Sequence, residues 1–107
     1  MVDDVQALRL AALREMLVAD PDDPFALYGL GLELKVMGDL DGAQTHFRRL
    51  LEVEPTQLYG YYQLGEILLA EGENEEAEEV LVDGVERAQA AGEPKALNEL
   101  KALLDMC

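Results

Sequence analysis

The densest group of ionisable side chains is the acidic run EGENEEAEEV at residues 71–80. Its six carboxylates could bind a hard cation, but the run lacks the Asp-x-Asp-x-Asp-Gly order of a calcium loop. Carboxylates at the start of a helix are stabilised by the helix dipole. The run therefore favours a solvated helix face, with a docking patch for a basic partner as the alternative. We expect no metal and no other cofactor.

Residue types that could perform covalent chemistry are scarce. His46 is the only histidine, the chain contains no serine, and the single cysteine, Cys107, is the last residue. We expect His46 to be exposed beside Arg48 and Arg49, and Cys107 to be inert, with cross-linking of a dimer or redox sensing as the alternatives. With no phosphate-binding loop and no catalytic grouping, the sequence does not predict an enzyme.

The charge balance excludes several classes of partner. The net charge is −15, from 23 acidic and 8 basic residues, of which only three are lysines. Such a chain cannot neutralise phosphates, which argues against nucleic acid and against anionic membrane surfaces. Two interpretations remain: a basic protein partner steered in by the field, or adaptation to high salt.

Length and hydropathy predict one small soluble domain. The chain has 107 residues and 50% apolar content. Its first residues, MVDDVQALR, are acidic and lack the apolar segment of a secretory signal, and no apolar run is as long as a membrane span. We therefore expect a cytoplasmic protein.

The sequence repeats itself at an interval of 34 residues. MLVADP at 16–21 aligns with LLEVEP at 50–55. The same interval aligns the Leu-Gly pairs at 30–31 and 64–65, the glycines at 38 and 72, and the alanines at 43 and 77. Helical periodicity alone would not align glycines and prolines, so the agreement indicates a structural repeat.

Apolar spacing and breaker residues predict six successive helices and leave no room for strands. Asp39 is the expected N-cap of the third helix and Gly38 the expected C-cap of the second. The expected helices span residues 4–18, 24–37, 39–53, 58–71, 74–91 and 94–106.

On these residues the chain resembles the tetratricopeptide repeat family, whose signature spreads large residues, Leu-Gly, Ala, an aromatic and Pro over 34 positions. The matching positions are Leu27, Leu30, Gly31, Leu34, Ala43, Phe47 and Pro55 in one repeat, and Tyr61, Leu64, Gly65, Leu68, Ala77 and Leu81 in the next. Gly84 replaces the usual second alanine, and no proline closes the second repeat.

The resemblance implies an all-α solenoid of antiparallel helix pairs in a single domain, 1–107. It divides into an N-terminal half-repeat (1–21), two repeats (24–57 and 58–91) and a C-terminal capping helix (94–107). Neighbouring pairs stack to bury their apolar faces, so the outer sides of the end helices should be polar. Candidate outer residues are Asp3, Asp4, Arg9, Arg14, Glu15, Lys95, Glu99, Lys101 and Asp105.

The resemblance also implies a concave groove, lined by the first helix of each repeat, that binds a peptide or helix. The corresponding positions are Phe25, Tyr28, Gly29, Leu32, Lys35, Tyr59, Tyr62, Gln63, Glu66 and Leu69. Phe25, Tyr28 and Leu32 also form a second apolar stripe, beside the core stripe of the same helix. Tyrosines suit a binding surface because they offer an apolar body and a polar tip. The alternative is that these rings complete the core.

The expected function is therefore protein–protein interaction, with self-association as a homo-oligomer through the same aromatic face as the alternative. Some family members grip a terminal carboxylate with Lys and Asn, but Tyr28, Leu32 and Gln63 stand at those positions here. An apolar or aromatic segment, with a basic residue opposite Glu66, fits better.

Two kinds of glycine interrupt the first helix of the repeats, each at a cost of about 1 kcal/mol relative to alanine. Gly31 and Gly65 share a register and are expected where the paired helices cross, with Ala43 and Ala77 as small partners. Gly29 has no counterpart, because Gln63 takes its place, and it is expected to leave room for a ligand.

If the acidity reflects adaptation to high salt, molar salt should stabilise the protein by screening repulsion among its carboxylates. We expect the melting temperature to rise by ~5 °C or more between low salt and 2 M NaCl, which corresponds to about 1 kcal/mol. Thermal melts followed by circular dichroism measure this shift. Equal stability in the two conditions would rule out the high-salt interpretation.

Overall fold

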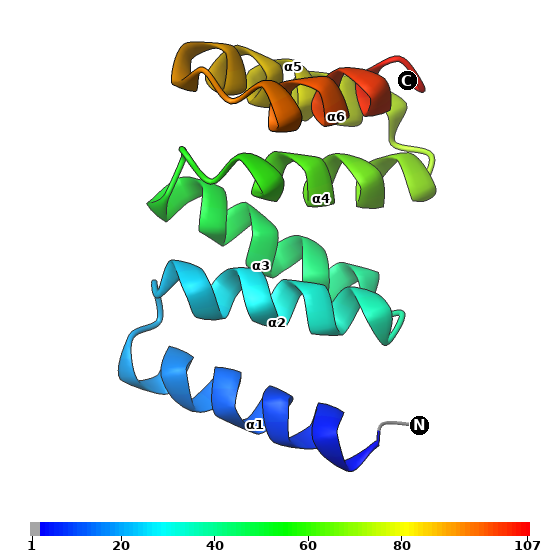
Figure 1. The fold of residues 1–107 in the computed structure, drawn as a ribbon. Helices are drawn as coiled ribbons and strands as arrows, with labels where there is room; N and C mark the ends of the chain where they lie inside the picture. The colour runs from blue at the N-terminus through cyan, green and yellow to red at the C-terminus, as the bar shows by residue number, and fades with distance from the viewer. Residues whose placement is uncertain (1–2) are drawn as a thin grey trace. The chain divides into compact units, whose positions relative to one another are not determined.

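The computed structural model describes residues 3–107, which form six α-helices and no strand (Figure 1). The helices are α1 (Asp4–Ala19), α2 (Pro24–Val36), α3 (Leu40–Val53), α4 (Leu58–Ala70), α5 (Asn74–Ala91) and α6 (Pro94–Leu104). The all-α prediction and all six expected helices are confirmed, with ends that differ by at most two residues. Residues 1 and 2, assigned to the predicted half-repeat, lie outside the described residues.

The chain divides into two compact units. The first ends at Glu54 and contains α1, α2 and α3, with α2 packed against both of the others. The second, Pro55–Cys107, contains α4, α5 and α6, each of which packs against the other two. The boundary falls three residues before the repeat boundary expected at 57–58. The single domain and its four segments stay predictions.

Glycines with positive φ end the first helix of each repeat, as expected for Gly38. Gly38 has φ of 84° and Gly72 has φ of 77°, a backbone conformation that disfavours side chains. Each lets the following amide turn back onto the helix: Asp39 N–H donates to the Leu34 carbonyl at 2.9 Å and Glu73 N–H to Leu68 at 2.8 Å. This geometry satisfies carbonyls at the helix ends.

Aspartates cap the start of each helix in the first unit. Asp3 accepts from the amide of Gln6 at 2.6 Å, Asp23 from that of Phe25 at 3.0 Å, and Asp39 from that of Gly42 at 2.9 Å. The Asp39 cap was predicted and is confirmed. Part of the acidity of the chain thus satisfies free amides at helix starts.

In the first unit, α2 and α3 cross closely at Gly31. A Cβ built on Gly31 would lie 2.7 Å from Cζ of Phe47 and 2.8 Å from its Cε1. The packing role expected of Gly31 is therefore confirmed, and the atoms nearest to this Cβ position belong to the Phe47 ring. The small partner expected on α3, Ala43, stays a prediction. Phe47 is fully buried, so the missing side chain of Gly31 provides the space that the ring occupies.

The second unit repeats this arrangement with a smaller side chain. A Cβ on Gly65 would lie 2.5 Å from Cδ2 of Leu81, so a large side chain of α5 packs against this glycine. The small partner expected on α5, Ala77, stays a prediction. Sequence reasoning chose the small residues because it considered only backbone approach. In both repeats the glycine accepts a bulky side chain from the facing helix.

Gly84, the departure from the family signature, also has a packing reason. A Cβ there would lie 2.7 Å from Cβ of Tyr61. One repeat earlier these two positions hold Leu50 and Leu27, so a larger residue on α4 accompanies a smaller one on α5. Tyr61 is 3% exposed, and its hydroxyl donates a 2.7 Å hydrogen bond to the Pro55 carbonyl. The polar end of this core residue is therefore satisfied.

Two glycines of α2 give a matched test of the crossing. Gly31→Ala should destabilise the protein by about 1–3 kcal/mol, because the buried Phe47 ring has little room to move. In Gly29→Ala, the new methyl meets only the flexible end of Leu13, at 2.9 Å, and alanine favours the helix. Urea unfolding should therefore show Gly29→Ala to be near neutral. Equal effects of the two substitutions would contradict the assignment of Gly31 to a tight crossing.

Candidate peptide-binding surface

Two tyrosines on α4 form an aromatic pair in the second unit. Tyr59 and Tyr62 have ring centroids 6.5 Å apart and an interplanar angle of 62°, an edge-to-face contact. The spacing i, i+3 places both rings on one side of the helix. Both side chains are half-buried, so part of each ring is accessible. Edge-to-face packing fixes the rings without covering them.

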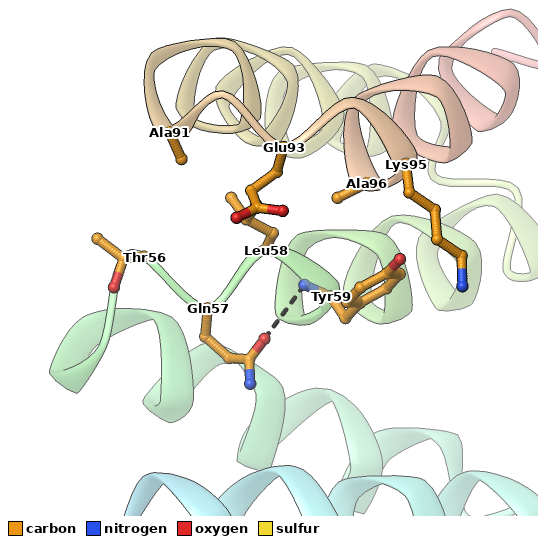
Figure 2. Close-up of a pocket in the computed structure, with 8 residues that line it drawn as sticks. All are labelled: Thr56, Gln57, Leu58, Tyr59, Ala91, Glu93, Lys95 and Ala96. Carbon is orange, nitrogen blue, oxygen red and sulfur yellow. Dashed lines mark hydrogen bonds between the residues drawn. The ribbon is translucent and has the colours of Figure 1, made fainter.

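A cleft of about 530 Å³ lies at the start of α4 and contains Tyr59 (Figure 2). One side comes from the segment before α4 and its first turn, where the amide of Tyr59 donates to the Gln57 side chain at 3.2 Å. The other side comes from the end of α5 and the start of α6. The lining residues are Thr56, Gln57, Leu58, Tyr59, Ala91, Glu93, Lys95 and Ala96.

The surroundings of Tyr62, next to this cleft, favour its neutral hydroxyl. Burial raises the pKa of Tyr62, and the negative charges of Glu66 and Glu99 raise it further. Tyr62 is therefore a hydrogen-bond donor at neutral pH, with carboxylates from α4 and α6 close by. Such a surface can bind an apolar side chain and a neighbouring positive charge.

The remaining predicted residues of the second unit follow Tyr62 along α4. Gln63, Glu66 and Leu69 are half-buried. Gln63 and Glu66 already take part in interactions within the protein, as do Tyr59 and Lys35. These groups would exchange existing partners for those of a ligand.

The predicted residues of the first unit are divided between surface and core. Phe25 is 71% exposed, whereas the Tyr28 ring packs edge-to-face against Phe47 at 5.7 Å. Leu32 and Lys35 are half-buried. Tyr28 therefore partly fits the alternative in which the rings complete the core.

Gly29 does not adjoin an open space. A Cβ there would lie 2.9 Å from Cδ2 of Leu13, so the side chain of a flanking helix occupies the room that was expected for a ligand. The expectation is wrong because Gly29 was compared only with Gln63, and the approach of Leu13 from α1 was not considered. Gly29 is a contact between these two helices.

The ten predicted groove residues thus lie on α2 in the first unit and on α4 in the second. Their assignment to one groove stays a prediction. The sequence analysis missed Glu93 and Lys95, which line the cleft with Tyr59. An available signal was the register of Lys95, 36 residues after Tyr59 and 70 after Phe25, once the two extra residues before α6 are allowed for.

His46 differs from its expected position. It is half-buried, and its Nδ1 lies 2.7 Å from the Gly42 carbonyl, which makes Nδ1 the donor. It lines a hollow of the first unit together with Arg14, Leu17 and Val18 of α1. The expectation of full exposure was wrong because α1 contributes to the surroundings of this face of α3.

The acidic run and the cysteine show no reactive arrangement. Glu75, Glu78 and Glu79 are exposed on α5, and residues 3–107 contain no group of His, Cys, Asp and Glu placed to bind a metal ion. Cys107 is exposed, and slight desolvation of its thiol, together with the charge of Glu78, raises the pKa of that thiol. The reactive thiolate is therefore disfavoured. Within the same residues, no helix combines the length and apolarity of a membrane span.

The fold and its internal repeat define an antiparallel helical-repeat protein. The sequence model of the tetratricopeptide repeat family matches residues 37–104. A tetratricopeptide repeat domain protein from Salinibacter ruber, solved by NMR, is 30% identical, with a TM-score of 0.74 over 79% of this chain and 86% of that one. The chain belongs to the tetratricopeptide repeat family. A comparison with curated proteins found no match.

More distant structures share the fold. The TPR2B domain of yeast Sti1, solved with an Hsp70 peptide, has a TM-score of 0.82 at 18% identity and covers 89% of this chain and 76% of its own. The Yersinia enterocolitica secretion chaperone SycD, solved with a peptide of the translocator YopD, has a TM-score of 0.82 at 22% identity, over 91% and 75%. At these identities the likeness concerns the fold alone.

Proposed function

We propose that this protein is an interaction module that binds a peptide or helical segment of a partner protein. The observation that carries the proposal is the accessible Tyr59–Tyr62 pair on α4, with Tyr59 opening into the cleft beside Lys95. Membership of the repeat family supports it, and two proteins of similar fold were solved with peptides bound.

The surface chemistry narrows the ligand to an apolar or aromatic segment with at least one basic residue. The two rings supply apolar contact area with few rotatable bonds to immobilise. Burial raises the pKa of Tyr62, and the negative charges of Glu66 and Glu99 raise it further, so both carboxylates act on this tyrosine. A Lys or Arg next to the inserted side chain would face these carboxylates.

Selection from a displayed library of random peptides, followed by fluorescence anisotropy, tests the proposal. Tyr59→Ala/Tyr62→Ala should weaken binding of the selected peptides by about tenfold or more, as for aromatic hot spots. Val82→Ala/Met106→Ala, which removes exposed apolar side chains elsewhere in the second unit, is the matched control and should change it less than about twofold.

Two outcomes would refute the proposal. One is a selection that returns only peptides insensitive to the loss of both tyrosines. The other is a concentration-dependent dimer, seen by light scattering, that the same two substitutions convert to a monomer. That result would assign the surface to self-association, which is the alternative function.

A further inference from the structure

Exposed apolar side chains gather on α1 and α2. Residues 3–107 have eight large hydrophobic residues with exposed side chains, and six of them fall between positions 5 and 37. These six are Val5 (60% exposed), Leu8 (71%), Val18 (85%), Phe25 (71%), Val36 (78%) and Met37 (43%). The polar residues expected on the outside of α1 are exposed, but exposed apolar side chains lie among them. Those of the six that lie side by side can form an interaction surface, because a contiguous exposed apolar patch marks one.

Several of these side chains share, by helical register, the side of α1 and α2 that surrounds the approach of Leu13 to Gly29, and we call this apolar face the α1–α2 valley. Its floor is the contact between Leu13 and Gly29. At one end, Arg9 Nε donates to Glu33 at 2.7 Å and Gln6 Nε2 donates to the same carboxylate at 3.3 Å. These bonds fix the first half of α1 beside the second half of α2.

The sides of the valley follow from helical geometry. On α2, Phe25, Gly29, Leu32 and Val36 recur at i, i+4, i+7 and i+11, which is a single stripe whose centre faces Leu13. On α1, Val5 lies one turn before Arg9, whose side chain reaches α2, and the half-buried Met16 lies one turn after Leu13. The valley is therefore an apolar strip with Val5 and Val36 near one end. Val18 lies on the other flank of α1, in the hollow with His46.

In the second unit, α5 and α6 correspond to α1 and α2, and a third helix, α4, covers them. There, α4 packs against both α5 and α6, and Gly65 of α4 accepts the side chain of Leu81. Leu13 stands 68 residues before Leu81, two repeat intervals, and is therefore in the same register. Among the described helices, α1 packs extensively only against α2. In the first unit, Leu13 of α1 packs next to Gly29 of α2. In the second unit, the corresponding Leu81 packs against Gly65 of α4, the helix that covers α5 and α6.

We propose that the α1–α2 valley binds an amphipathic helix of a partner protein that has basic flanks and a small residue opposite Leu13. The small residue of the partner helix would leave room for the Leu13 side chain, as Gly65 leaves room for Leu81. The basic flanks follow from charge, because residues 3–37 contain seven acidic residues and three basic ones. A second copy of this chain suits the valley less well, because each copy carries a net charge of −15.

This site goes beyond the proposed peptide surface on α4. It shares Phe25, Gly29 and Leu32 with the predicted groove, but its other residues come from α1 and the end of α2. By analogy with α4 and α5, the bound helix would run antiparallel to α1 and meet Leu13 near its middle. Loss of Tyr59 and Tyr62 should leave it intact.

A helix from this chain provides the probe. It is a synthetic peptide of residues 57–71, which contains α4, with Glu66→Lys and Glu71→Lys and two lysines added at each end. Labelled peptide is titrated with the full chain. Val5→Gln/Val36→Gln should weaken binding by about tenfold, since two exposed apolar contacts are lost. Val18→Gln/Val82→Gln makes the same change outside the valley and should weaken it less than about twofold.

Two peptide variants test the specific features. A Gly65→Leu peptide should lose binding, because its side chain would meet Leu13. A peptide that keeps Glu66 and Glu71 should bind more weakly than the lysine form, and this difference should shrink in 1 M NaCl. Each result supports one half of the proposal, the small residue or the basic flank.

Three outcomes would overturn the proposal. The lysine peptide could fail to bind, or it could bind with the same loss in the valley variant and its matched control. In the third, sedimentation would show a dimer of the peptide-free protein that dissociates only in Val5→Gln/Val36→Gln, which would make a second copy the occupant. If this proposal fails while binding of the selected peptides still depends on Tyr59 and Tyr62, the function proposed for the α4 surface still holds.

Discussion

The insertion of a large side chain against a glycine on the facing helix determines how the helices of each repeat pack. Phe47 meets Gly31 in the first unit and Leu81 meets Gly65 in the second. At interior packing density, any side chain on these glycines must displace the neighbour or part the helices. The close packing that each glycine permits offsets the cost of placing a glycine inside a helix. The burial of Tyr61 and the positions of Tyr59 and Tyr62 on α4 depend on the same close packing of α4 against α5.

Sequence reasoning succeeded where local chemistry decides the outcome. Helix ends were predictable because few residue types suit them. Asp39 accepts a helix amide with its side chain, and Gly38 adopts a positive φ. The packing of Gly31 and Gly65 was predictable because the repeat places both at one register. Their contacts with Phe47 and Leu81 were not predicted, since an interval shows which positions correspond but not which side chains touch. The prediction for Gly29 was wrong for the same reason, because its contact with Leu13 depends on how α1 packs against α2.

The candidate binding surface illustrates the same limit. Tyr59 and Tyr62 were found because they lie on one side of a predicted helix. Lys95 was missed because α6 was treated as a cap and not as a helix in register with α2 and α4. The apolar exposure of α1 was missed because a polar outer side was assumed for an end helix. The protein thus carries two separate candidate surfaces: aromatic side chains on α4, and an apolar valley between α1 and α2.

A double-mutant cycle at Gly65 and Leu81 tests the central claim most directly. The atoms that a Gly65 methyl would meet are Cδ2, Cγ and Cδ1 of Leu81, and Leu81→Ala removes all three. Gly65→Ala alone should destabilise by about 1–3 kcal/mol through overpacking, and Leu81→Ala alone by about 2–5 kcal/mol through a cavity. The account predicts that the double variant is more stable than the sum of the two losses by about 1 kcal/mol or more in urea unfolding. Additive losses would show that the glycine does not accommodate Leu81 and would contradict the account.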